Sequence, residues 1–380
     1  MAAGTTVLAV DTDVLVVLAI LATRLIVPLF ILRFPLPAIL VALVVDAADQ
    51  TILQQTTDFS LDRYQNFDKA LDIYYLAIAY LAVYRNWTND FAIQVAAFLW
   101  YYRLVGVLLF EIFGARWLLL VFPNTFEYFF IAYCVVQLAW DPRRMTNRAV
   151  IGLAAFIWIV IKLPQEWWIH VAQNDFTDFT KETIFGVEAD SAWIDAFSNR
   201  PAVVVALLAA AAGLVFAGLR LRSRLPAKDW SYSVDTDRTD AMVRRPDPLP
   251  TSMRAAIIEK VALVGLVGGI FALVLETGAT GLQIVGATVF VVVANVGISI
   301  WLARRGFEWK SLAVESVVLV VVNATLLSVY ATLFSDGRLE RTTSLFFGFL
   351  LTVLIVLYDR YRPVTAEPAA NREEPAVTAP

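Results

Sequence analysis

Three charged side chains interrupt long apolar stretches of the sequence. Arg24 lies ten residues after Val14 in an apolar segment, Arg103 lies within FLWYYRLVG, and Glu127 lies within PNTFEYFF. At 1.5 Å per helical residue, each is roughly 15–18 Å from one end of its segment. A lone arginine near the centre of a bilayer costs on the order of 3 kcal/mol even on the most lenient scale. We therefore expect all three side chains to face the interior of a helix bundle.

These charges have either a structural role or a ligand to bind. A buried ion pair between Glu127 and Arg103 would hold two helices together, and it would leave Arg24 without an acid at its own depth. A surplus buried arginine suits anionic ligands, because its guanidinium donates paired hydrogen bonds to carboxylate or phosphate. We therefore predict a substrate site for an anionic small molecule or lipid at Arg24, Arg103, Glu127 and Lys162.

A second pattern places polar residues at every fourth position of IVIKLPQEWWIHVAQNDFTD. Its members are Lys162, Glu166, His170, Asn174 and Asp178. Residues four apart lie on one face of a helix, and an unperturbed histidine titrates close to neutral pH. The pattern predicts a proton path through Glu166, His170 and Asp178. The alternative is the polar end of a helix that leaves the membrane.

Four aspartates border the second and third apolar segments. Asp46 and Asp49 close the second segment, and Asp68 and Asp72 open the third. Asp68 and Asp72 are four residues apart, a spacing at which like charges repel unless they share a proton or a cation. If the two pairs meet, they form a site for a hard divalent cation such as Mg²⁺, Mn²⁺ or Ca²⁺. Otherwise they are solvated helix ends. No other cofactor is predicted.

The elements that must position these residues are membrane-spanning helices. Of the 380 residues, 59% are apolar and 17% are charged, against about a quarter charged in soluble proteins. The net charge of −4 provides no basic surface for nucleic acid. A single cysteine, Cys134, and a single histidine exclude an intrachain disulfide and a bis-histidine haem. The composition predicts an all-α polytopic membrane protein.

Apolar runs of the length needed to cross a bilayer predict ten or eleven transmembrane helices. The second run is only thirteen residues long and begins between Pro35 and Pro37, so it is either a short span or a re-entrant segment. The runs are residues 14–34, 36–48, 70–84, 91–110, 117–138, 149–168, 201–221, 256–275, 282–302, 312–333 and 344–358.

Lysine and arginine in the short loops predict the orientation, because these residues stay on the cytoplasmic side. Basic groups follow the fifth, seventh, ninth and last segments, which places the C-terminus in the cytoplasm and the protein in the inner membrane. Four regions are expected: a transmembrane bundle with the polar site (1–221), a solvated cytoplasmic linker (222–255), a four-helix apolar scaffold (256–362) and a disordered tail (363–380).

Three classes of function fit this pattern. The favoured one is a secondary transporter with a charged site at mid-depth, open to the outside and suited to an anionic or lipid-linked substrate. The alternatives are a membrane-embedded transferase that acts on a lipid phosphate at the outer face, and a non-catalytic structural or assembly protein. Whether the chain is an enzyme, and its oligomeric state, do not follow from the sequence. Its expected partners are the bilayer and an anionic small molecule or lipid, and no nucleic acid.

Overall fold

The computed structural model describes residues 12–57, 61–174, 176–222, 225–239, 253–274 and 341–361, with scattered single residues between 286 and 325. Within these ranges the chain is helical and contains no strand, which confirms the all-helical class. The segments predicted at 282–302 and 312–333 and the tail at 363–380 fall largely outside the described residues.

Six described helical segments are long and apolar enough to cross a membrane. This agrees with the predicted class, while the total of ten or eleven spans stays a prediction. The six segments are Thr12–Leu32, Pro35–Thr56, Asp90–Phe113, Trp117–Gln137, Asn147–Val171 and Pro201–Arg220.

Helix α2 (Pro35–Thr56) corrects the expected short second segment. It has 22 residues and begins at its own prolines, which fit the first turn of a helix because the amide groups there need no partner. At 1.5 Å per residue it is about 33 Å long, enough to cross a bilayer and too long for the expected thirteen-residue element. The apolar run ends early because the last turns of the helix carry Asp46, Asp49 and the further polar residues of the stretch DQTILQQT.

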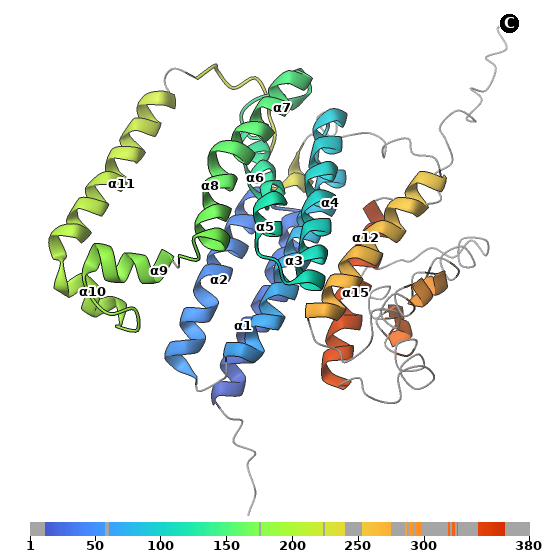
Figure 1. Cartoon of the computed structure of the whole chain (residues 1–380). Helices are drawn as coiled ribbons and strands as arrows, with labels where there is room; N and C mark the ends of the chain where they lie inside the picture. Colours follow the sequence, from blue (N-terminus) through green and yellow to red (C-terminus); the bar gives the residue numbers. More distant parts are fainter. Residues whose placement is uncertain are drawn as a thin grey trace, which may run out of the picture.

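Helix α3 (Leu61–Asn86) is the centre of the bundle (Figure 1). Every residue from Ala70 to Val83 except Asp72 is at most 5% exposed. The helix contacts α1 (Thr12–Ile26), α2, α4 (Asp90–Phe113), α6 (Thr125–Gln137), α12 (Met253–Val274) and α15 (Arg341–Tyr361). A helix that is apolar on all sides is buried on all sides, so polar groups on α3 must find partners on its neighbours.

The predicted span at 117–138 is divided in two. Helix α5 (Trp117–Val121) ends before Pro123, and α6 begins at Thr125. Proline cannot continue the hydrogen bonding of the preceding turn. The break therefore places Asn124 just before the first turn of α6 and Glu127 within that turn, with backbone groups free to accept and donate.

The segment Asn147–Val171 is helical throughout but not regular. Helix α7 (Asn147–Phe156) continues through a π-helical turn (Ile157–Lys162), α8 (Leu163–Glu166) and a second π-helical turn (Trp167–Val171). Pro164 removes a backbone donor in this region, and the wider π turns accommodate such a loss. The helix then ends, and Gln173 has a positive φ of 53°.

Helix α11 (Pro201–Arg222) stands apart from the bundle (Figure 1). No residue of its most apolar stretch is buried. It is connected to the bundle through α9 (Phe176–Phe179), a π-helical turn (Thr180–Phe185) and α10 (Trp193–Asn199).

Helices α12 and α15 pack against α3 and α4 and share one apolar core with them. Lys260 of α12 and Asp359 of α15 form an ion pair of 2.7 Å that joins these two helices. Whether the second half is a separate scaffold stays a prediction.

Part of the predicted solvated linker lies against the bundle. We call residues 225–239 the docked linker. Asp235 accepts two hydrogen bonds from Arg33, at 2.9 and 2.8 Å, and the backbone amide of Thr236 donates to the Arg33 carbonyl at 2.9 Å. Asp237 pairs with Arg85. Two arginines therefore hold this segment in place: Arg33, at the end of the predicted span 14–34, and Arg85, directly after the predicted span 70–84.

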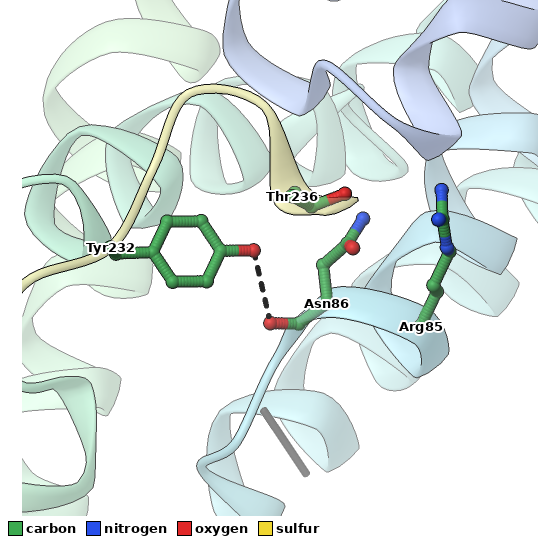
Figure 2. A pocket seen from close by; sticks show the side chains of 4 residues that line it. All are labelled: Arg85, Asn86, Tyr232 and Thr236. Carbon is green, nitrogen blue, oxygen red and sulfur yellow. Dashed lines mark hydrogen bonds between the residues drawn. The ribbon is translucent and has the colours of Figure 1, made fainter. Parts of the chain in front are cut away.

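The docked linker also encloses a cavity of about 80 Å³ at the end of α3. Figure 2 shows its lining: Arg85 and Asn86 from α3, and Tyr232 and Thr236 from the docked linker. The Tyr232 hydroxyl donates to the Asn86 carbonyl at 3.5 Å. Further along, Asp229 pairs with Arg144 at 2.6 Å. The docked linker therefore contacts α3, the α1–α2 junction and the α6–α7 turn.

Candidate functional site

Arg24 lies at the centre of a group of four aspartates. Its side chain is 4% exposed, and its guanidinium donates to Asp46 at 2.5 Å and to Asp72 at 2.6 Å. It also contacts Asp49 and Asp68. The expectation that Arg24 lacks an acid at its own depth was therefore wrong, because α2 and α3 present their aspartates at that level. We call these five residues the aspartate centre.

Helix geometry explains how these aspartates converge. Asp46 and Asp49 are three residues apart on α2, and Asp68 and Asp72 are four apart on α3, so each pair occupies one helix face. Arg24 lies near the last turn of α1. The sequence left open whether the two aspartate pairs meet. In the structure they do, and the guanidinium of Arg24 fills the space between them.

Tyr64 completes the buried side of the aspartate centre. Its hydroxyl donates to Asp49 Oδ2 at 2.6 Å, and this same oxygen contacts Arg24. The other oxygen, Asp49 Oδ1, is buried and has no hydrogen-bond partner among the described residues. A buried carboxylate oxygen without a partner is costly, so this side of the centre is incompletely satisfied.

A second group of polar residues surrounds Glu127, which is 4% exposed. Its carboxylate accepts hydrogen bonds from the Tyr75 hydroxyl at 2.9 Å and from Asn124 Nδ2 at 2.6 Å. The predicted ion pair with Arg103 is not formed. Arg103 instead donates to the Phe122 carbonyl at 3.0 Å, which the break between α5 and α6 leaves free.

Lys162 lies between two carboxylates but does not contact either. It is 4% exposed, and its ammonium lies 3.9 Å from the centre of the Tyr128 ring. Glu127 and Glu166 act on it electrostatically from beyond ion-pair distance. Among the described residues, its ammonium has no hydrogen-bond acceptor. Water or a ligand group between these charges would complete the arrangement.

Glu166 connects this group to the sole histidine. The side chains of Glu166 and His170 lie 2.9 Å apart, and Glu166 also accepts from the backbone amide of Asn124 at 3.2 Å. We call Arg103, Glu127, Lys162, Glu166 and His170 the mixed-charge centre.

The predicted ridge of polar residues at every fourth position continues only as far as His170. The helix ends at Val171, and Asp178 lies in a different helix, α9, where it is exposed. The expectation of one continuous polar face was therefore wrong, because it assumed a regular helix through 162–178. The structure brings Lys162, Glu166 and His170 together and carries Asp178 on another element.

Tyr75 lies between the two centres. It lies on α3 less than one turn after Asp72, and its hydroxyl points to Glu127 on α6. Asp46 and Asp72 are close enough to the Tyr75 hydroxyl to interact with it electrostatically. Sequence analysis missed Tyr64, Tyr75 and Asn124; for Tyr75, its position three residues after Asp72 on one helix face was the available indication.

A layer of aromatic residues follows next along α3. Tyr80 packs against Trp100 at 5.9 Å and against Phe126 at 6.3 Å, measured between ring centres, and all three are fully buried. Beyond them, the hydroxyl groups of Tyr80 and Tyr84 donate to Glu259 of α12 at 2.8 and 2.6 Å. The aromatic layer separates the two centres from the end of the bundle that carries the docked linker.

Ion pairs at that end lower the pKa of two aspartates. Hydrogen bonds from Arg33 hold the pKa of Asp235 below its ordinary value. Burial raises the pKa of Asp141, but hydrogen bonds from Arg143 outweigh this effect, and the net pKa is lowered. Both carboxylates are therefore ionised at neutral pH and can hold the neighbouring arginines.

The candidate site is thus defined by geometry: an aspartate centre and a mixed-charge centre in the interior of a helix bundle, with Tyr75 between them and bonded to Glu127 of the second. No protein family, curated protein or solved structure matches the chain.

Proposed function

We propose that the protein is an inner-membrane protein with ten or eleven spans and a cytoplasmic C-terminus. The six membrane-capable helices support membrane insertion. The end of the bundle that carries Arg33, Arg85, Arg143 and Arg144 also carries the docked linker. Basic residues beside spans favour the cytoplasmic side. Both polar centres then lie toward the outer half of the bundle.

We infer further that the protein is a proton-coupled secondary transporter. The observation that carries this proposal is the placement of Tyr75, which donates a hydrogen bond to Glu127 of the mixed-charge centre and lies on α3 three residues after Asp72 of the aspartate centre. Titratable residues of both centres are thus neighbours inside the bundle. Chains of acidic residues and histidine inside membranes are typical of proton relays. The proposed path runs from His170 and Glu166 past Lys162 to Glu127 and Tyr75, and from there to the aspartate centre. Water would bridge the two gaps in it, at Lys162 and between Tyr75 and the aspartates.

Charge favours a cation as the transported species, in place of the anion expected from the sequence. Arg24 already contacts four carboxylates, so its guanidinium has little capacity left for an anionic substrate. In the mixed-charge centre, the two positive charges of Arg103 and Lys162 are balanced by the two negative charges of Glu127 and Glu166. The aspartate centre alone carries surplus charge, and this charge is negative.

The aromatic layer supports a closed inner side. Tyr80, Trp100 and Phe126 are fully buried and pack together between the centres and the end that we place in the cytoplasm. Access from the outer side is favoured by the partial exposure of Asp46 and Asp72, whose side chains are 30% and 41% exposed. Alternating access then requires the aromatic layer and the docked linker to move apart.

The direct test is proton movement across liposomes that contain the purified protein and an internal pH-sensitive dye. External Mn²⁺ or Na⁺ should cause release of internal protons from vesicles with the wild-type protein. Glu127→Gln should abolish this response. Glu111→Gln is the matched control, because Glu111 pairs with Lys69 at 3.4 Å outside both centres, and it should respond like wild type. An unchanged response in Glu127→Gln would refute the proton path.

A membrane-embedded transferase is the second candidate, and a specific observation favours it. Single carboxylate oxygens of Asp46, Asp68 and Asp72 lie within 4.8 Å of one another, as in sites where a metal ion activates a phosphate group. A transferase predicts that these aspartates are essential while Glu127→Gln has little effect. The liposome measurement therefore separates the two candidates. If neither substitution matters beyond protein abundance, the protein is structural.

A further inference from the structure

We infer that the docked linker is an inhibitory strap, which holds one end of the bundle closed and is released by rising ionic strength. It is bonded to three different parts of that end: the α1–α2 junction through Arg33, the end of α3 through Arg85, and the α6–α7 turn through Arg144. Alternating access moves groups of helices relative to one another. A segment bonded to all three parts opposes such a movement.

The strongest contacts of the docked linker are ion pairs. Arg33 donates two parallel hydrogen bonds to Asp235, at 2.9 and 2.8 Å, and its Nε also lies 3.3 Å from Asp237 Oδ2. Asp237 pairs with Arg85 as well. A carboxylate that accepts two bonds from one guanidinium makes a stronger contact than a neutral hydrogen bond. Charge therefore holds this part of the docked linker.

Charged groups also hold the docked linker at the α6–α7 turn. Asp229 pairs with Arg144 at 2.6 Å and accepts a hydrogen bond from the backbone amide of Asp141 at 3.0 Å. The guanidinium of Arg143 lies 4.7 Å from the centre of the Trp230 ring, a cation–π contact. The two ends of the docked linker are thus attached in the same way.

The docked linker adds nothing to the apolar core. None of its residues belongs to the buried apolar clusters of the described chain or packs against them, and Leu225 and Val234 are exposed. Helices α12 and α15, in contrast, contribute side chains to the main cluster. Salt screens contacts between charges but does not weaken apolar burial. Salt can therefore release the docked linker while the bundle stays folded.

The ion pairs of the docked linker are open to screening. The side chains of Arg33, Asp237 and Arg144 are 48%, 41% and 70% exposed. The screening length falls from about 10 Å at 0.1 M salt to about 3 Å at 1 M, and buried pairs are screened much less than exposed ones. The contacts of Arg24, whose side chain is 4% exposed, should therefore persist at salt concentrations that release the docked linker.

The cavity of about 80 Å³ at the end of α3 makes release easier (Figure 2). It lies between the docked linker and the bundle, and all four residues that line it are polar. About 10–15 Å³ is enough for one water molecule in a polar cavity, so this one has room for several. Water can thus replace the contacts of the docked linker without first entering a dry interface.

Hydrogen exchange tests this release without any measurement of transport. The purified full-length protein in lipid nanodiscs is transferred to deuterated water with potassium chloride at about 50 to about 500 mM. Exchange at the Thr236 amide, which donates to the Arg33 carbonyl, should become about tenfold faster, because several exposed pairs weaken together. The amides of α3 from Ala70 to Val83 should stay protected, and sucrose at the same osmolality should have no effect.

Two variants show whether the ion pairs carry the response. Asp235→Asn removes the paired hydrogen bonds from Arg33, so its Thr236 amide should exchange fast already at low salt and respond little to more. Arg148→Gln is the matched control. Arg148 is exposed at the start of α7, close to the same turn, and forms no ion pair with the described residues. This variant should keep the salt response of the wild type.

The inhibitory effect rests on the proposed function and is measured as proton movement in liposomes, with potassium chloride varied equally on both sides. Asp235→Asn should move protons several-fold faster than wild type at low salt, and wild type should approach it at high salt. Arg148→Gln should behave like wild type. A linker with a purely structural role would give the opposite sign, because its release would lower stability and activity together.

The two proposals fail in distinguishable ways. Exchange at Thr236 that does not change with salt overturns the strap, even if protons move. Proton movement that is slower in Asp235→Asn than in wild type also overturns it, because the docked linker would then support activity. Salt-dependent exchange without proton movement in any of the proteins overturns the transporter and leaves the salt-released docking standing.

Discussion

Tyr75 on α3 donates a hydrogen bond of 2.9 Å to Glu127 on α6. Tyr75 lies three residues after Asp72 of the aspartate centre, so this bond is where the mixed-charge centre comes nearest to the aspartates along α3. Glu127 also accepts from Asn124, so its carboxylate is held from two sides. In the proposed path, protons pass between the centres by way of this pair.

We therefore expect Tyr75→Phe to reduce proton movement by about tenfold or more while the protein still folds. The hydrogen bond from Asn124 remains, so the loss of one donor to a buried carboxylate should cost about 1–3 kcal/mol at most. The measurement is cation-driven proton release from liposomes, beside thermal unfolding in detergent.

Tyr74→Phe is the matched control for this substitution. Tyr74 is the adjacent residue, is fully buried, and donates to the Leu25 carbonyl at 3.2 Å instead of to Glu127. It should lose similar stability and retain proton movement. Equal losses of activity in both variants would mean that Tyr75 acts only through packing.

Arg24 should be essential for stability. Removing one partner of a buried ion pair leaves uncompensated charge and costs about 3–5 kcal/mol, and here four carboxylates would be left. We expect Arg24→Gln to lower the melting temperature strongly, and added Mn²⁺ or acid to restore part of the loss.

Arg116→Gln is the control, since Arg116 is exposed and exposed charges contribute little. The measurement is thermal unfolding at several pH values and Mn²⁺ concentrations. If Arg24→Gln were as stable as wild type, the four aspartates would have to be neutral already, and the argument from surplus charge would fail.

Docking of the linker should weaken at acid pH. Arg33 lowers the pKa of Asp235 in the docked form. A lowered pKa means that docking is favoured above the ordinary pKa of aspartate, and that this contribution is lost as pH falls through the lowered value. Docking should therefore be constant at neutral pH and weaken only in acid.

Hydrogen exchange at the backbone amide of Thr236 reports this docking directly, because that amide donates to the Arg33 carbonyl. Asp235→Asn should exchange fast at every pH. Arg238→Gln, on the exposed side of Asp235, should change exchange less. Slow exchange in Asp235→Asn would show that other contacts hold the linker.

Much of the fold is predictable from apolar runs, and the exceptions have physical causes. Asp46 and Asp49 shortened the second predicted segment because a hydropathy scale scores every aspartate as hydrophilic, whether or not it is paired inside a bundle. The ridge from Lys162 to Asp178 assumed one continuous helix, whereas the helix ends at Val171 and Gln173 has a positive φ. The bonds from Arg33 to Asp235 join residues about 200 positions apart, and no local pattern reveals such a contact.

The sequence predicted which residues belong to the candidate site better than it predicted which of them contact one another. Depth alone indicated that Arg24 and Glu127 are buried, since isolated charges do not face lipid. Their partners depend on helix rotation and on the break at Pro123, which single-sequence patterns do not specify. The sequence therefore assigned Arg103 to Glu127, while the structure assigns Tyr75 and Asn124 to it.

Gly106 should be the glycine least tolerant of substitution among those in the described helices. It lies on α4, and a Cβ atom there would come within 2.1 Å of Phe122 Cβ. Phe122 belongs to the break between α5 and α6, and its carbonyl accepts the hydrogen bond from Arg103. Gly106→Ala would therefore push this segment away, at a cost of about 1–3 kcal/mol from overpacking, and would disturb the mixed-charge centre.

Gly152→Ala provides the comparison, because Gly152 lies on α7 with open space where its Cβ would be. Alanine favours a helix over glycine by about 0.8–1.0 kcal/mol, so this variant should be as stable as wild type or more stable. Thermal unfolding of the two variants, with proton movement as a second measurement, should separate them clearly. Equal stability of Gly106→Ala and Gly152→Ala would show that the contact between α4 and the break is loose, and that Arg103 does not depend on Phe122 for its position.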